Sequence, residues 1–560
     1  MAQQTILSTA DFVKLRRHNA YYVDKTAFVE QWLVSSYEVL LLPRPRRFGK
    51  TLNMSTLRTF LERSPIDRSP LFEGLQVWDS ENARKHFQRY PVVSISFKGV
   101  KTSSWAEMYA SIRELISTEF LRHDYLAEPG KLRPTVAKMF QSVLDREDDL
   151  PLYFVALQNL SSLLTAYHGE QTVILIDEYD LPIQAAYAKG FYEEAVTFFR
   201  NFLTEGFKDN PNLFKGVMTG VLRVAKESLF SGLNNVEVRS VLDSEYATAF
   251  GFTEAEVEKL AQDLGAPEVA DELRSWYNGY RFAGNVIYNP WSVMAYASDR
   301  SRGFLPHWIN TGSNDVLRSL VFEKGRAITQ ELEALLRGET MSQVISDHVV
   351  LRELDADRSA VWSLLLMSGY LTVRSRKTVK GDIFAELAIP NQEVMVAFTR
   401  GVMNWLDMVL EDTAHPAQVL SKAMLEGDVE TFEDLLSDMV KASLSYHDTK
   451  GRQPEIVYQA FILGMLVFLA DGWNVRSNQE SGDGRYDLAV IPKQPGKPGV
   501  IIELKKQQVH RGQTVDQALD SAMAQIRDRR YTVELQAAGA EPILQYGGVF
   551  DGKRVWVRKA

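Results

Sequence analysis

Cysteine is absent from the 560-residue chain. Disulfide bonds and thiolate-bound metals are therefore excluded, and this composition is typical of a cytoplasmic protein. Apolar runs of transmembrane length are also absent, and the N-terminus lacks the basic-then-apolar layout of a signal peptide. The longest apolar run, residues 460–470, predicts a buried core helix. We therefore expect a cytoplasmic protein with no membrane partner.

An excess of positive charge is missing as well, because the formal net charge is −9. Any contact with nucleic acid must then come from local basic patches rather than from a general field. Arg44, Arg46, Arg47 and Lys50 form one such patch, and nucleotide phosphates would account for it. A chain of this length exceeds what one hydrophobic core supports, so three or four domains are expected.

A phosphate-binding signature follows the apolar run at residues 39–43. That run predicts a strand, residues 52–62 predict a helix, and a turn ending in Gly-Lys-Thr joins them. In such a P-loop, backbone N–H groups surround the phosphates, the lysine reaches the β and γ oxygens, and the threonine hydroxyl binds Mg²⁺. Arg44 replaces the first glycine of the full pattern. The predicted nucleotide-binding residues here are Arg46, Arg47, Phe48, Gly49, Lys50 and Thr51.

Two carboxylates end a second apolar run within residues 172–180. The run is long and rich in β-branched residues, which predicts a strand covered on both faces of a parallel sheet. Open α/β sheets bind ligands at the carboxyl ends of their strands. We therefore expect Asp177 to bind the nucleotide and its Mg²⁺, and Glu178 to polarise the attacking water. The alternative is that both acids only cap the next helix or pair with surface cations.

Two further strands fit the same sheet, at residues 91–97 and 213–220. The second ends near Thr219, with Arg223 four residues further on. A polar residue at this strand end commonly senses the γ-phosphate in P-loop ATPases. Thr219 is therefore the candidate sensor and Arg223 the candidate transition-state cation. An ordinary strand-end hydroxyl and a solvated charge are the alternatives.

The middle of the chain indicates architecture but no chemistry. Short helices and turns are predicted from residue 253 to about 320. Within them, the aromatic residues of 276–282 are expected in the core, and Asn278-Gly279 predicts a tight turn. Residues 321–442 are predicted to be largely helical, interrupted by a small β section at 370–390.

Two strands joined by a loop rich in proline and glycine are predicted at residues 484–491 and 499–506. Asp487 lies near the start of the first strand. Glu503 and Lys505 share one face of the second, because side chains alternate along a strand. Pairing of the two strands would gather two carboxylates and one ammonium around a single point. Carboxylates bind Mg²⁺ and a lysine can orient water or phosphate, which is the pattern of PD-(D/E)xK nucleases.

Two flanking features fit the same nuclease pattern. Glu455 opens a predicted helix and is the candidate third carboxylate, although an acid in a first helical turn is also favourable through the helix dipole alone. An apolar stripe over residues 515–526 predicts a second helix, with Gln525 at its edge. The expected catalytic residues are thus Asp487, Glu503, Lys505 and Gln525, and the expected metal ligands are Glu455, Asp487 and Glu503.

Seven sequence blocks in a fixed order span nearly the whole chain: residues 21–26, 44–51, 71–75, 230–235, 276–282, 389–393 and 477–487. Together they resemble a bacterial family of predicted AAA-ATPase-like proteins that carry a C-terminal PD-(D/E)xK nuclease domain. The resemblance implies an α/β fold with an ASCE-type, AAA-like P-loop ATPase core, a helical lid and middle region, and a restriction-endonuclease-like α/β domain. Arg44 in place of glycine belongs to that family pattern.

Four domains follow from these predictions. We expect a P-loop ATPase domain at 1–237, a helical or winged-helix-like lid at 238–320, a mostly helical linker at 321–442 and a nuclease-like domain at 443–560.

Three functions fit these predictions. The chain could be an ATP-regulated nuclease in defence or repair, an ATP-dependent switch or scaffold that binds nucleic acid without cutting it, or a signalling ATPase that recognises a protein. Intact Asp487, Glu503 and Lys505 favour the nuclease, whereas the acidic net charge argues against tight sequence-independent DNA binding. The expected cofactors are ATP and Mg²⁺, with Mn²⁺ as an alternative at the nuclease site. The expected partner is nucleic acid, DNA more than RNA, and the sequence leaves a homo-oligomer open.

Overall fold

The computed structural model forms two compact units, one of residues Met1–Thr311 with Ser342–Val394 and one of Gly312–Met341 with Met395–Ala560. Each unit has a five-stranded sheet, parallel in the first unit and mixed in the second, and together they make a mixed α/β protein. The structure describes residues 9–128, 131–223, 233–308, 329–347, 351, 357–409, 416–446, 469, 472–477, 480–481, 484–507, 512–528, 531–550 and 554–560.

A five-stranded parallel sheet forms the centre of the first unit. The strand order is β2 (Val92–Ser96), β3 (Thr172–Asp177), β4 (Leu213–Gly220), β1 (Val39–Pro43) and β5 (Val236–Val238). Every residue of β1 and β3 is buried, as their apolar runs predicted. Because β4 lies between β1 and β3, the ends of these three strands are neighbours at one edge of the sheet.

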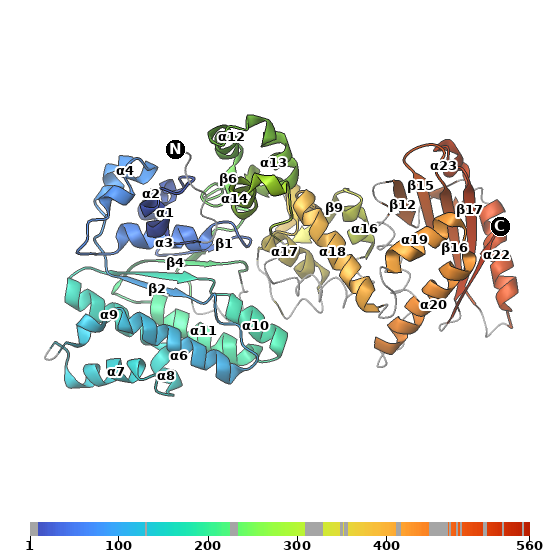
Figure 1. Ribbon diagram of the computed structural model, residues 1–560. Coiled ribbons are helices and arrows are strands. Elements are labelled where there is room, and N and C mark those ends of the chain that lie inside the picture. Colours follow the sequence, from blue (N-terminus) through green and yellow to red (C-terminus); the bar gives the residue numbers. More distant parts are fainter. Residues whose placement is uncertain are drawn as a thin grey trace. The chain divides into compact units, whose positions relative to one another are not determined.

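Helices cover both faces of this sheet (Figure 1). One face carries α6 (Trp105–Leu121), α9 (Ala156–His168), α10 (Leu181–Lys189) and α11 (Tyr192–Phe207). The opposite face carries α1 (Phe12–Arg17), α2 (Ala27–Val34) and α3 (Lys50–Leu61). Helix α3 occupies the position predicted for the helix after the phosphate-binding turn.

A smaller helical region with its own three-stranded sheet follows in the same unit. Its strands are ordered β6 (Phe252–Thr253), β8 (Asn285–Tyr288) and β7 (Tyr280–Phe282), and its helices are α12 (Glu254–Asp263), α13 (Ala270–Tyr277) and α14 (Pro290–Ser298). Tyr277, Tyr280 and Phe282 are buried, which confirms that these aromatic residues belong to the core. Gly279 has a φ of 94°, and a β-carbon there would collide with the backbone of Pro390.

The last part of the first unit contains a β-hairpin, at the place where the sequence predicted a β section. Helix α17 (Arg358–Ser368) precedes strands β10 (Thr372–Val379) and β11 (Asp382–Ala388), which pair antiparallel. The sheet order is β10, β11 and β9 (Met341–Ile345). Strand β9 was not predicted, because its five residues lie in a segment whose general pattern is helical. Helices α16 (Thr329–Leu336) and α18 (Gln392–Val409) flank these elements in the chain.

The second unit has a mixed five-stranded sheet. Its strand order is β12 (Trp473–Ser477), β15 (Leu488–Pro492), β16 (Gly499–Lys506), β17 (Ile543–Phe550) and β18 (Val555–Lys559), with only β16 and β17 parallel. Helices α22 (Val515–Asp528) and α23 (Val533–Ala537) lie on one face, and α19 (Pro416–Glu426) and α20 (Val429–Tyr446) on the other (Figure 1). The predicted stripe of α22 is buried at Ala518, Leu519, Ala522 and Ile526.

The strand predicted at 484–491 is divided in two. Residues Gly484–Arg485 form β14, which pairs with β13 (Glu480–Ser481), and β15 begins at Leu488. Asp487 lies between them because its carboxylate accepts the backbone N–H of Leu504 at 2.7 Å, beyond the last β15–β16 pair. The Asp487 carboxylate therefore accepts the hydrogen bond that a backbone carbonyl would accept if the pairing of β15 with β16 continued.

Among the helices that the structure describes, none combines the length and the apolar character needed to cross a bilayer. The predicted core helix at 460–470, apart from the buried Leu469, and the helix start at Glu455 lie outside the described residues.

Candidate functional site

The loop between β1 and α3 is a compact turn with two left-handed residues. Arg47 has a φ of 69° and Gly49 a φ of 86°, and α3 begins at Lys50. Arg44, at the position of the missing first glycine, has no positive φ, so a side chain is tolerated there. Its N–H donates to the carbonyl of Gly220 at 3.0 Å and so continues the pairing of β1 with β4.

Lys50 is 3% exposed and lies under this loop. Its ammonium donates to the carbonyls of Arg44 at 3.2 Å and Pro45 at 3.3 Å. It also forms an ion pair with Glu178 Oε1 at 3.3 Å. The lysine is therefore buried, oriented by the loop itself, and paired with the acid that follows β3.

Asp177 connects the ends of three strands with the start of α3. Thr51 Oγ1 donates to its carboxylate at 2.9 Å, Ser96 Oγ at 3.2 Å and Thr219 Oγ1 at 2.6 Å. Burial, and then the charge of Glu178, raise the pKa of Asp177. Three hydroxyls thus converge on a carboxylate whose charge is incompletely balanced.

Glu178 is in a strained position beside Asp177. Its φ is 55°, which is rare for a residue with a β-carbon, and such strain is concentrated at functional sites. Its Oε2 atom is buried and has no hydrogen-bond partner among the described residues. Because the threonine hydroxyl and the acids are adjacent, the residues fit a bound Mg²⁺, an ion that prefers oxygen ligands.

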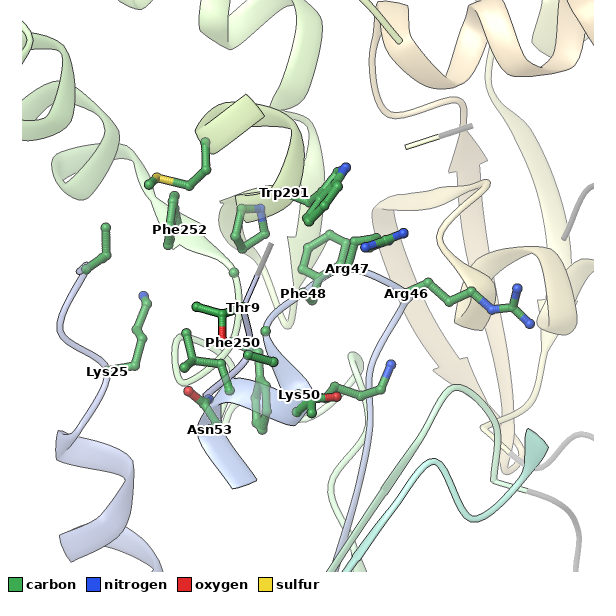
Figure 2. A pocket seen from close by; sticks show the side chains of 18 of the residues that line it. Thr9, Lys25, Arg46, Arg47, Phe48, Lys50, Asn53, Phe250, Phe252 and Trp291 are labelled. Carbon is green, nitrogen blue, oxygen red and sulfur yellow. The ribbon is translucent and has the colours of Figure 1, made fainter. Parts of the chain in front are cut away.

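A cavity of about 400 Å³ opens beside this cluster. Glu178 lines it. So do six predicted residues of the loop and helix start: Arg46, Arg47, Phe48, Gly49, Lys50 and Thr51. Figure 2 shows Arg47 against Trp291, and the Arg47 guanidinium carbon lies 4.1 Å from the centre of that ring. Arg46 points away from the other labelled side chains (Figure 2). The Phe48 ring packs on Tyr280 in the core, so Phe48 serves mainly to anchor the loop.

Several lining residues come from distant segments that the sequence did not assign to the site. Tyr21 and Lys25 come from the chain before β1, Lys98 and Lys101 from the loop after β2, and Phe252, Trp291 and Met294 from the smaller helical region. Block 21–26 was the one sequence signal that could have indicated Lys25. The remaining residues are brought in by packing between elements, which no local pattern encodes.

Arg44 does not belong to the basic patch in which the sequence placed it. Its side chain is 0% exposed and donates to the carbonyls of Pro43 at 2.8 Å, Arg239 at 2.6 Å and Tyr246 at 3.0 Å. Burial lowers the pKa of its guanidinium to about 9. The expectation that nucleotide phosphates explain Arg44 is therefore wrong, because its side chain is buried and both terminal nitrogens donate to backbone carbonyls.

Arg223 is not among the residues that line the cavity, and it forms an ion pair with Asp347 at 3.2 Å. The segment before it is fixed by Asp180, whose buried carboxylate accepts the N–H groups of Val221 at 3.0 Å and Leu222 at 2.8 Å. Burial, followed by the charge of Glu178, raises the pKa of Asp180 to about 6. Thr219, by contrast, lies directly against Asp177.

The second unit brings Asp487, Glu503 and Lys505 together at the junction of β15 and β16. Lys505 donates to Glu503 Oε1 at 2.7 Å. Glu503 is 3% exposed, and its Oε2 atom is buried without a hydrogen-bond partner among the described residues. Burial, and then the charge of Asp487, raise the pKa of Glu503 to about 7. Burial also raises the pKa of Asp487.

Gln525 of α22 completes this cluster. Its Oε1 accepts from Lys505 at 2.5 Å, and its amide donates to the hydroxyl of Tyr531 at 3.0 Å. Tyr531 was not predicted. The described residues contain no group of three acids or histidines that could hold a metal, and Glu455 lies outside them. The orphaned Glu503 oxygen beside Asp487 nevertheless fits a divalent cation, because carboxylates are its preferred ligands.

Comparison with known proteins agrees with this division. Residues 7–230 match the family described as predicted AAA-ATPase, and residues 453–560 match the PD-(D/E)XK nuclease superfamily. An uncharacterized protein in the vnfD 5′ region of Azotobacter chroococcum mcd 1 is 28% identical over 554 residues, which cover 96% of this chain and 95% of that protein. No solved structure matches the chain.

The resemblance indicated by the sequence blocks is thus confirmed: the chain carries a predicted AAA-ATPase segment followed by a segment of the PD-(D/E)XK nuclease superfamily.

Proposed function

We propose that the first unit binds ATP with Mg²⁺ in the 400 Å³ cavity and hydrolyses it. The observation that carries this proposal is the convergence on Asp177 of Thr51 from the helix start and Thr219 from the neighbouring strand, beside the Lys50–Glu178 ion pair. The loop, the buried lysine and the start of α3 supply donors for phosphate oxygens. A strand order with β4 between β1 and β3 supports the ASCE-type core implied by the resemblance.

The two acids have different roles in this proposal. Mg²⁺ bound near Thr51 and Asp177 would offset charge on the phosphates. Lys50 would exchange its contacts with Glu178 and the loop carbonyls for the β and γ oxygens. Glu178, freed from that ion pair, would accept a proton from the attacking water. Thr219 holds Asp177 in place and senses the occupied site through it.

Two substitutions test the ATPase. Lys50→Ala removes the phosphate cation and should abolish ATP binding, measured by titration calorimetry. Glu178→Gln keeps the shape but cannot accept the proton, so it should bind ATP and lower turnover roughly a hundredfold or more. Far-UV and near-UV circular dichroism of both variants would establish that the fold is retained. Normal ATP affinity in the first variant, or normal turnover in the second, would contradict these assignments.

We propose further that the second unit is a metal-dependent nuclease, with DNA as the preferred substrate over RNA. The supporting observation is that hydrogen bonds link Glu503, Lys505 and Gln525 around an unpaired buried oxygen, while the N–H of Leu504 holds the Asp487 carboxylate beside Glu503. A divalent metal held by the carboxylates would activate water and stabilise charge on the scissile phosphate. Lys505 would approach the phosphate, and Gln525 holds its ammonium in place. Such an activity would serve defence against foreign nucleic acid or repair.

Neighbouring lysines provide a matched control for the nuclease. Glu503→Gln, Asp487→Asn and Lys505→Met should each abolish cleavage of plasmid, single-stranded DNA or RNA with Mg²⁺ or Mn²⁺. Lys506→Met should not, because side chains alternate along β16 and residue 506 belongs to the other face. EDTA should stop the wild type. If the wild type binds but never cuts, with or without ATP, the second unit is a binding module instead.

A further inference from the structure

An exposed basic hairpin lies in the first unit, although the chain as a whole is acidic. Strand β10 and its turn carry Arg374, Arg376, Lys377 and Lys380, and all four are exposed. None of them makes a side-chain hydrogen bond or ion pair with the part of the chain that the structure describes. The hairpin has two carboxylates, Asp382 and the half-buried Glu386. Its charge is therefore positive and not neutralised within the protein.

The hairpin has a tight turn and one open edge. Lys380 and Gly381 have φ values of 52° and 96°, which is the conformation of a tight two-residue hairpin turn. Among the described strands, β10 pairs only with β11 and so forms the edge of its sheet. The strands are in register from Ser375, opposite Glu386, to Val379, opposite Asp382. The backbone positions that carry the cations are therefore set by the strand pairing.

A fifth cation extends the patch. The N–H of Arg281, on β7, donates to Thr372 Oγ1 at 2.9 Å, which fixes β7 beside the start of β10. Arg374 is influenced by this neighbour, because burial and then the charge of Arg281 lower its pKa. Like charges held close together raise the free energy of the isolated protein. A polyanion would relieve this repulsion.

The arrangement of the cations favours a nucleic acid over a compact anion. Arg376 and Lys377 are consecutive residues of a strand, so their side chains point to opposite faces of the ribbon. Because β9 covers the other side of β11, the open β10 edge and the turn are the parts of this ribbon that could meet the major groove of a DNA duplex, where phosphate backbones lie on both sides. Each phosphate that a lysine or arginine neutralises also releases condensed counterions, which strengthens binding.

We propose that the β10–β11 hairpin, with Arg281, is a docking surface for the phosphate backbones of duplex DNA. This inference rests on the proposed nuclease function for the identity of the partner, and it adds a contact in the compact unit that does not contain Asp487 and Glu503. This basic stripe was not apparent in the sequence, because its residues are spaced along β10 and its turn and one of them, Arg281, comes from β7.

The test compares two variants of the full chain that lose the same charge. One carries Arg374→Gln, Arg376→Gln and Lys377→Gln; the control carries Lys85→Gln, Lys138→Gln and Lys189→Gln, three exposed lysines of the same unit. Both are built on Glu503→Gln, and binding of a fluorescent 20-base-pair duplex is followed by anisotropy in EDTA at several salt concentrations. Cleavage then plays no part in the measurement.

The hairpin variant should bind at least tenfold more weakly at 0.1 M salt. The slope of log K against log salt should fall by about 2 to 3, because each lost phosphate contact contributes about 0.9. The control should stay within twofold of the parent. Equal losses in both variants, or no binding of the duplex by the parent, would overturn the proposal. If the parent bound duplex RNA or polyglutamate more strongly than duplex DNA, the surface would be assigned to that partner and the proposal of a DNA surface would be rejected.

Two further outcomes separate this surface from the nuclease. If the wild type does not cleave but the hairpin variant still loses DNA affinity, the docking surface stands and the proposed nuclease activity fails. If the parent binds no nucleic acid and the hairpin variant aggregates, the cations serve instead to keep the edge strand from pairing with other chains, and the proposal is rejected.

Discussion

The Arg44 side chain uses its charge to organise the interior rather than to bind a ligand. It bonds three backbone carbonyls that belong to β1 and to the chain after β5, and it lies 5.2 Å from the Phe250 ring centre. Arg46, two residues on, lines the cavity. The two arginines of this sequence motif therefore lie in different surroundings, and we expect different functions for them.

Substitution of each by methionine should separate these functions. Arg44→Met removes a buried donor from three carbonyls, of which the Tyr246 carbonyl keeps the N–H of Ala249, so we expect the unfolding free energy of the first unit to fall by on the order of 3 kcal/mol. ATP affinity at low temperature should be nearly unchanged. Arg46→Met should weaken ATP binding and leave the thermal midpoint within about 2 °C, given that Arg46 is only half-buried and such a substitution costs little. Thermal unfolding followed by circular dichroism, with nucleotide titration, measures both, and the reverse pattern would restore Arg44 to the phosphate site.

Glu393 at the start of α18 predicts a pH dependence. It is fully buried and accepts hydrogen bonds from Ser292 Oγ at 2.8 Å and from the Trp308 N–H at 2.7 Å. Burial raises its pKa from 4.5 to about 7. The folded protein therefore keeps a proton that the unfolded chain releases. Its stabilising contribution is complete below about pH 4.5 and is lost as the pH rises to 7.

Glu393→Gln mimics the protonated acid and should remove this dependence. Near pH 5 the variant and the wild type should differ little, whereas at pH 8 the variant should be more stable by on the order of 3 kcal/mol. The comparison uses the urea midpoints of both proteins at each pH value. Contributions from other groups, such as His307, cancel because both proteins share them. If the wild type instead became more stable relative to Glu393→Gln as the pH rises, the free-energy cost of burying the charged Glu393 would be compensated by its surroundings.

At the scale of elements, long buried runs were predictable and shared sites were not. Strands β1, β3 and β4 and helices α3 and α22 lie where the sequence predicted them, because burial on both faces or on one stripe leaves a periodic pattern. Strand β9 was missed because its five residues lie in a segment whose general pattern is helical. The cavity wall formed by Tyr21, Phe252 and Trp291 could not be foreseen, since it depends on how separate elements pack.

The same reasoning revises which element supplies a transition-state cation. The loop after β2 brings Lys98 to the cavity that Glu178 lines, whereas Arg223 pairs with Asp347. We therefore predict that Lys98→Met lowers ATP turnover roughly a hundredfold with little change in KM, as loss of a transition-state donor does. Arg223→Met should have a small effect. Steady-state phosphate release compares them, and a larger loss in Arg223→Met would return that role to the residue after β4.

At the scale of the whole molecule, we expect the two units to influence each other. An unregulated nuclease would be toxic to its cell, which motivates control by nucleotide. Binding coupling is reciprocal, so if ATP changes DNA affinity by a given factor, DNA must change ATP affinity by the same factor. We expect a factor of at least 5, the lower end of typical coupling. The coupling factor is measured on Glu503→Gln by two pairs of titrations. One pair follows DNA binding at zero and at saturating ATP, and the other follows ATP binding at zero and at saturating DNA. Equal affinities within each pair would show that the two sites are independent.

The first unit is discontinuous in sequence, which has a consequence for its synthesis. Residues up to 311 leave the ribosome before segment 342–394, yet that later segment supplies Asn391, whose amide donates to the Asn278 carbonyl at 2.6 Å, and Glu393, which holds Ser292. A nascent chain that ends before residue 394 therefore exposes surfaces that its own later part must cover. We expect ATP-binding competence to arise only after this segment has emerged, so the interval between the two is a natural point for chaperone engagement.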